Sequence, residues 1–147
     1  MVTREGTAKV VDFGLAFQVD TVASNSARPK EPRPQVAGTV AYMCPERALN
    51  PPTIDFRADI YSLGVTFFEM VTGRLPFTAS TALEVMMAHY CDPMPSAHEM
   101  APDVPVAVSG VIDRMTAKQP SDRYQSYDEV RAALAAIHNP SATTTTR

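Results

Sequence analysis

The spacing of apolar and polar residues predicts a domain built mainly from helices. Between Asp55 and Gly73, almost every turn of a helix would carry large apolar side chains. These are Ile60, Leu63, Val65, Phe67, Phe68, Met70 and Val71. We predict a helix over residues 56–72, because Asp55 is a favourable N-cap and Gly73 a favourable stop. A helix that is apolar on nearly all sides belongs inside a core.

Four further segments also have helical character. We predict a helix from Ser80 or Thr81 to about Tyr90, and others over residues 105–117 and 127–138. Their expected inward positions are Leu83, Met86, Met87 and Tyr90 in the first, Val108, Val111, Ile112 and Met115 in the second, and Val130, Leu134 and Ile137 in the third. Residues 44–49 fit one helical turn, because proline is tolerated at a first-turn position.

The remaining segments read as a strand, loops and a tail. Residues 7–11 predict a short strand, which the turn signal Asp12-Phe13-Gly14 ends. Residues 18–40 show no periodicity, and a loop of that length is usually functional or disordered. The prolines around residues 93–102 predict another loop, and the polar residues 139–147 predict a disordered tail.

Composition and charge narrow the class of protein. A chain of 147 residues with 45% apolar and 20% charged residues is typical of one globular domain. The net charge of −3 offers no concentrated basic face for nucleic acid. The longest apolar run, residues 60–71, is too short to span a bilayer. We therefore expect a soluble, cytoplasmic protein without a membrane segment in this chain.

The cysteines and histidines give no sign of a metal site. Cys44 and Cys91 lie far apart and fit no metal spacing, so we expect buried or partly buried free thiols. His89, His98 and His138 also fit no ligand spacing, and we expect them at the surface or partly buried.

Four stretches carry the chemical signal. They are VVDFGLAF (10–17), GTVAYMCPE (38–46), DIYSLGVTFFEMVTGRLPF (59–77) and KQPSDRY (118–124). The tripeptide Asp12-Phe13-Gly14 alone is a weak signal of function, because an ordinary turn at the end of a strand can have the same sequence. In this order and spacing, however, the set resembles the C-terminal lobe of a eukaryotic-like serine/threonine protein kinase of the bacterial type. The resemblance implies a mainly α C-lobe of an α+β parent fold, with residues 1–138 as a partial kinase domain.

The resemblance implies a role for the first motif. Asp12 matches the family's magnesium-binding aspartate, and a carboxylate is a suitable ligand for that hard cation. Phe13 and Gly14 match the turn that sets active or inactive geometry. Residues 15–43 then match the activation segment. Its candidate phosphorylation sites are Thr21, Ser24 and Ser26, which can equally be ordinary solvated hydroxyls.

The later motifs match residues that bind substrate or hold the lobe together. Gly38 and Thr39 match the segment that meets the acceptor peptide, although Thr39 can also simply close a loop. Glu46 and Arg123 match a buried salt bridge, although Cys44 replaces the family's alanine in Ala-Pro-Glu. Asp59 matches the aspartate that anchors the catalytic loop, and its alternative reading is charge stabilisation at a helix N-terminus. Glu69 aligns with a position that reads basic substrate residues in some relatives.

Several kinase motifs are not in these 147 residues. They include no glycine-rich loop, no Val-Ala-Ile-Lys strand and no His-Arg-Asp…Asn loop. The part of a kinase that these residues resemble thus excludes the N-lobe and the catalytic loop. We therefore expect the chain to be part of a longer kinase. That parent would use ATP and Mg²⁺ to phosphorylate Ser or Thr of a protein substrate, whereas we expect neither cofactor to bind tightly to this chain alone.

Three functional readings stay open. We expect a kinase C-lobe piece that is inactive alone, and that self-associates through apolar surface left exposed beside residues 56–72. The alternative is a non-catalytic docking or regulatory module derived from a kinase C-lobe. A third reading is an unrelated helical domain, which would be favoured if Glu46 and Arg123 lay far apart.

Overall fold

The structure is a computed structural model that describes residues 40–49 and 54–138. The chain divides into the units Met1–Pro32 and Arg33–Arg147, and every described residue belongs to the second unit. The predicted strand at residues 7–11, the loop that follows and the tail at 139–147 lie outside the described residues.

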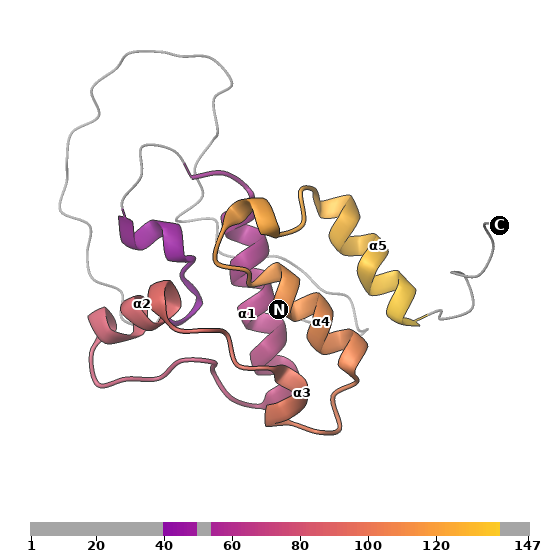
Figure 1. The fold of residues 1–147 in the computed structure, drawn as a ribbon, viewed down its shortest axis with the longest axis horizontal. Helices are drawn as coiled ribbons and strands as arrows, with labels where there is room; N and C mark the ends of the chain where they lie inside the picture. Colours follow the sequence, from indigo (N-terminus) through magenta and orange to yellow (C-terminus); the bar gives the residue numbers. More distant parts are fainter. Residues whose placement is uncertain (1–39, 50–53, 139–147) are drawn as a thin grey trace, which may run out of the picture. The chain divides into compact units, whose positions relative to one another are not determined.

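The described part of the chain is helical and contains no strand, which confirms the mainly α class (Figure 1). Its α-helices are α1 (Arg57–Thr72), α2 (Ala82–Cys91), α3 (Ala97–Met100), α4 (Val106–Met115) and α5 (Tyr127–His138). Its 3-10 helices are η1 (Val40–Tyr42), η2 (Pro45–Leu49) and η3 (Pro120–Asp122).

Helix α1 is the element around which the described core forms. It packs against α3, α4 and η1, while α4 also packs against α5 and α2 contacts η1 and η2 (Figure 1). Three apolar clusters each include part of α1. They are Ile60 with Val111, Met115, Tyr124 and Val130; Phe68 with Ala97, Val104 and Ile112; and Ala58, Tyr61 and Val65 with Cys44. Burying these side chains is the main favourable term in folding.

The extent of α1 agrees with the sequence, but its burial does not fully agree. The helix begins at Arg57, and Phe56 occupies the cap position without a side-chain bond. The carboxylate of Asp55 still accepts the backbone N–H of Arg57 at 2.9 Å, and Gly73 ends the helix with a φ of 70°. One side of α1 is buried, whereas Met70 is 73% exposed and lies outside the core.

Helix α2 begins as predicted but turns a different side inward. Thr81 and Glu84 form a capping box, in which each side chain accepts the other's backbone N–H. Of the predicted inward positions, only Met86 is half-buried: Leu83 is 62% exposed, and Met87 and Tyr90 are exposed too. The buried residue of α2 is His89, whose ring contacts Tyr61 and Phe77 and bonds to the backbone oxygen of Ala41 in η1.

Of the remaining α-helices in the described residues, α3 was not predicted from the sequence, whereas α4 and α5 were. Helix α3 lies where the prolines predicted a loop, and Ser96 caps it by accepting the backbone N–H of Glu99 at 3.4 Å. The Ser-x-x-Glu spacing was the available signal. Helix α4 ends two residues before the predicted limit. The inward positions predicted for α4 and α5 are all buried or half-buried.

Gly64 allows α1 and α4 to approach closely. A Cβ atom built at Gly64 would lie 2.7 Å from both Met115 Cβ and Thr116 Cγ2. Such separations are far below van der Waals contact, and neither neighbour is the free end of a flexible side chain. The absence of a side chain at Gly64 therefore sets the distance between these two helices.

We predict that Gly64→Ala destabilises the chain by roughly 1–3 kcal/mol, the usual cost of overpacking a core. Urea unfolding followed by circular dichroism measures the change. Gly110→Ala is the matched control, because no atom lies within 4 Å of the added Cβ in the exposed part of α4. That control should gain about 0.5–1 kcal/mol from helix propensity. Equal effects of the two substitutions would contradict the packing role of Gly64.

Candidate functional site

Most of the residues predicted to form a site fall outside the described residues. These are Asp12, Phe13, Gly14, Thr21, Ser24, Ser26, Gly38 and Thr39. The described part includes Glu46, Asp59 and Arg123, and it also includes residues 40–46, which directly follow Gly38 and Thr39. Residues 40–49 and 54–138 contain no group of three or more His, Cys, Asp or Glu that could hold a metal ion.

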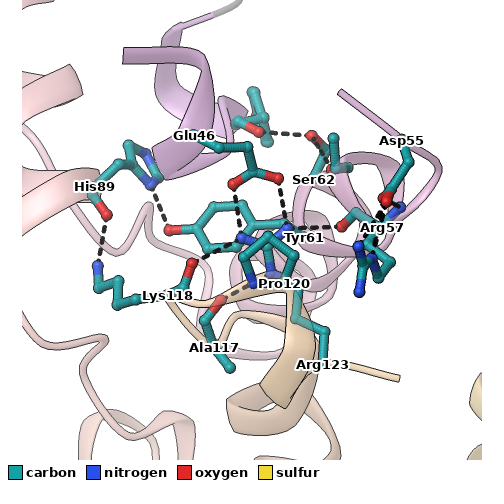
Figure 2. Close-up of polar contacts among 12 residues, drawn as sticks. Glu46, Asp55, Arg57, Tyr61, Ser62, His89, Ala117, Lys118, Pro120 and Arg123 are labelled. Atoms are coloured by element: carbon teal, nitrogen blue, oxygen red, sulfur yellow. Dashed lines mark hydrogen bonds and ion pairs between the residues drawn. The ribbon is translucent and has the colours of Figure 1, made fainter. Parts of the chain in front are cut away.

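Arg123 joins three parts of the chain through one buried guanidinium group. Its Nη1 and Nη2 donate to Oε1 and Oε2 of Glu46 at 2.8 and 2.7 Å, a bidentate pair (Figure 2). The other N–H groups donate to the backbone oxygens of Arg57 at 2.8 Å, Ala117 at 2.8 Å and Lys118 at 3.0 Å. All five guanidinium donors are thus satisfied, although the side chain of Arg123 is 0% exposed.

The charges of this pair are mutually stabilised. Burial raises the pKa of Glu46, but hydrogen bonds and the charge of Arg123 outweigh that effect and hold the pKa below its usual value. The guanidinium also lies 4.9 Å from the ring centre of Tyr61, within cation–π range. Glu46 is therefore a carboxylate at neutral pH, and η2 is tied to the start of α1.

The segment before Glu46 is held at three more points. The backbone oxygen of Tyr42 accepts Ser62 Oγ–H at 2.8 Å, and Tyr42 Oη donates to Glu69 Oε2 at 2.6 Å. The bond to Glu69 is the largest influence that raises the pKa of the Tyr42 phenol. The backbone oxygen of Ala41 accepts His89 Nε2–H at 2.9 Å. Glu69 aligns with a position that reads basic substrate residues in some relatives, whereas in this structure its carboxylate accepts the Tyr42 hydroxyl.

His89 is buried, which corrects the expectation that it lies at the surface or is partly buried. Its Nδ1 lies 2.8 Å from Tyr61 Oη, and its backbone oxygen accepts Lys118 Nζ at 2.7 Å (Figure 2). Burial lowers the pKa of His89 to about 4, so the ring is neutral at physiological pH. His98 is half-buried and His138 exposed, as expected.

The two cysteines are free, and they differ in exposure. Cys44 is buried beside Tyr61 and Val65, and burial raises the pKa of its thiol to about 11. Cys91 is exposed at the end of α2, so the expectation that it is buried or partly buried is wrong. A buried thiol with a raised pKa reacts slowly, because the thiolate is the reactive form.

Asp59 lies in the first turn of α1 with its side chain exposed. Within the described residues, its carboxylate accepts one hydrogen bond, from Tyr127 Oη at 3.3 Å. The ring of Tyr127 packs against Phe56 with centroids 5.5 Å apart. The carboxylate of Asp59 has capacity for more donors than this single long bond supplies.

We predict that Arg123→Met destabilises the chain by about 3–5 kcal/mol, because it leaves Glu46 partly buried without its partner. Urea unfolding followed by circular dichroism measures the effect. Arg131→Met is the matched control: its pair with Asp128 is 82% and 88% exposed, so the loss should stay below about 0.5 kcal/mol. Similar unfolding midpoints for both variants would refute the role assigned to Arg123.

We predict that stability falls as the pH drops from about 6.5 to about 4, partly because of His89. The pKa of His89 is about 4 in the folded chain against an ordinary value of 6.5, so the unfolded chain binds a proton first. The contribution is complete above pH 6.5 and is lost towards pH 4. His89→Gln lacks this component, and thermal melts across the pH range should show the two curves diverging only in that window. Parallel curves would show that His89 does not titrate as inferred.

Comparison with known proteins identifies the family. The protein kinase domain family matches residues 1–135 of the chain. Pkn1, a serine/threonine-protein kinase of Myxococcus xanthus, is 39% identical over 137 residues, which cover 91% of this chain and 19% of that protein. PrkC, a serine/threonine-protein kinase of Bacillus subtilis, is 33% identical over 134 residues, covering 91% of this chain and 20% of that protein.

A probable serine/threonine-protein kinase of Clostridium acetobutylicum is 35% identical over 139 residues, which cover 95% of this chain and 20% of that protein. The chain thus spans about a fifth of the length of the curated relatives it matches. None of the helices in the described ranges combines the length and the hydrophobicity that a bilayer-spanning segment needs. The chain belongs to the protein kinase domain family and is similar, within it, to bacterial serine/threonine kinases.

Proposed function

We propose that residues 1–138 form part of the C-lobe of a serine/threonine protein kinase that transfers the γ-phosphoryl of ATP to protein Ser or Thr. The observation that carries the proposal is the way in which residues 41–46 are held. Backbone groups of Ala41 and Tyr42 and the side chain of Glu46 are each bonded to different elements. A backbone segment held at several points keeps one conformation and can therefore position a bound peptide. Phosphoryl transfer depends on such positioning of the reacting groups.

The proposal assigns roles to the residues on either side of this segment. Asp12 would bind Mg²⁺, and Phe13 and Gly14 would form the turn that places it. Gly38 and Thr39 would meet the acceptor peptide, and Val40 separates them from Ala41, whose backbone oxygen is bonded to His89. Thr21, Ser24 and Ser26 are the proposed phosphorylation sites of the activation segment, and residues 139–147 are a proposed tail outside the domain.

Asp59 would anchor the catalytic loop of the kinase. Its exposed carboxylate, with one long bond from Tyr127 in the described structure, supports this role because it can accept backbone N–H donors. The alternative, stabilisation of the α1 N-terminus by its charge, needs no further partner.

These 147 residues alone should not catalyse the reaction. They contain no glycine-rich loop, no phosphate-binding lysine strand and no catalytic-base loop. Without those groups ATP and Mg²⁺ have few ligands, so neither should bind tightly to this chain alone.

A second candidate function is a non-catalytic docking module. Exposed Leu83, Met87 and Tyr90 on α2 favour it, because apolar side chains gathered on one helix can contact another protein. Self-association through such side chains is part of this candidate.

We predict that a chimera, with residues 1–138 replacing the matching segment of Bacillus subtilis PrkC, phosphorylates a generic protein substrate. The isolated 147-residue chain should not do so under the same conditions. In the chimera, Asp12→Asn should lower kcat by about a hundredfold or more, the order expected when one group that stabilises transition-state charge is removed. Incorporation of phosphate from labelled Mg–ATP measures each activity.

Asp103→Asn is the matched control, because Asp103 is an exposed acid far from the proposed motifs in sequence. It should leave the activity of the chimera unchanged. A chimera that melts cooperatively yet transfers no phosphate would overturn the catalytic proposal and favour the docking module. Phosphate transfer by the isolated chain would overturn the proposal that it is inactive alone.

A further inference from the structure

We propose that His89 is a positioning residue, whose Nε2–H bond to the backbone oxygen of Ala41 fixes η1 against α2. The distance is 2.9 Å, and the two residues are 48 positions apart in sequence. His89 comes from the last turn of α2, whereas Ala41 lies in the middle of η1. The inference deepens the proposed function, because residues 40–42 directly follow the proposed acceptor-peptide segment.

The hydrogen-bond geometry fixes the tautomer of His89. A backbone oxygen only accepts, so Nε2 must carry the hydrogen that points at Ala41. Nδ1 is then bare in the neutral ring and accepts the Tyr61 Oη–H at 2.8 Å. Both ring nitrogens are thus used once each, and neither is left unpaired in a side chain that is 1% exposed.

Packing holds the ring in that orientation. The ring of Phe77 meets it edge-on with centroids 4.9 Å apart, and the ring of Tyr61 does so at 5.7 Å. Rotating the imidazole would break both hydrogen bonds and disturb both aromatic contacts. His89 is therefore a rigid donor, which suits a group that sets the place of a backbone carbonyl.

The contact that holds Ala41, from His89, is connected through Lys118 to the contact that holds Glu46, from Arg123. Lys118 Nζ donates to the backbone oxygen of His89 at 2.7 Å, while the backbone oxygen of Lys118 accepts Arg123 Nη2 at 3.0 Å (Figure 2). Arg123 in turn holds Glu46. A continuous path of polar contacts thus leaves the segment at Ala41 and returns to it at Glu46.

Cys44 lies between Ala41 and Glu46 in sequence, so the reactivity of its thiol can show whether these two contacts hold. It is buried against Ala58, Tyr61 and Val65 of α1, so we expect its thiol to react when residues 40–46 move away from α1. The chain has two cysteines, so Cys91→Ser leaves Cys44 as the single thiol. The rate at which a thiol reagent labels Cys44 then measures how often this segment opens.

The test compares His89→Asn with His89→Gln in the Cys91→Ser background of the full chain. The amide of glutamine can reach the place of Nε2 and donate to Ala41, whereas that of asparagine is too short. We expect labelling of Cys44 to be about tenfold faster in His89→Asn, the order expected for one lost hydrogen bond, and close to the parent rate in His89→Gln. Urea unfolding of each variant separates opening of the segment from global unfolding.

Equal labelling rates in the two variants, or a fast rate that global unfolding fully explains, would overturn the proposal. Nitrogen-15 NMR of the histidine rings gives an independent reading: we expect hydrogen on Nε2 of His89, and hydrogen on Nδ1 instead would also overturn it.

In the PrkC chimera, His89→Asn should raise KM for the protein substrate several-fold and His89→Gln should restore it, with KM for ATP unchanged in both. Equal substrate KM values in both variants would overturn the positioning role. An inactive chimera would count against the proposed function, whereas the labelling comparison would still decide the role of His89.

Discussion

The described structure depends on one buried charge. The guanidinium of Arg123 has no exposure, and its five N–H donors are satisfied by Glu46, Arg57, Ala117 and Lys118. An unpaired charge in that position would be very costly, so all four residues must converge on it whenever the chain is folded. That requirement brings together η2, the start of α1 and the turn before η3. The bond from Arg123 to Glu46 therefore also fixes the position of residues 40–46.

Local signals in the sequence predicted the elements that local forces decide. The approximate limits of α1, the start of α2 near Thr81 and the inward positions of α4 and α5 follow from caps and from apolar spacing. Spacing failed for the inward face of α2, since it shows which side chains share a face but not whether a neighbour covers that face. It also missed α3, where the prolines outweighed the Ser96 cap.

Long-range contacts lay beyond any local pattern. Glu46 and Arg123 are 77 residues apart, and their pairing was expected only because the motifs resemble those of kinases. No motif indicated the contacts of His89. Its partners are a tyrosine 28 residues away and a backbone oxygen 48 residues away. A lone histidine among apolar residues gives no sign that it will be neutral and buried, because the burial that lowers its pKa depends on the packing of other elements.

Stability and position are controlled by different parts of this chain. The apolar clusters around α1 supply free energy without direction, since hydrophobic burial depends on area rather than angle. The polar contacts of residues 41–46 supply direction, because a bidentate pair and a fixed imidazole tautomer each accept one geometry. A buried ion pair often stabilises a fold no more than apolar residues of the same volume would. The pair between Glu46 and Arg123 is therefore better explained by where it holds the segment than by the energy it adds.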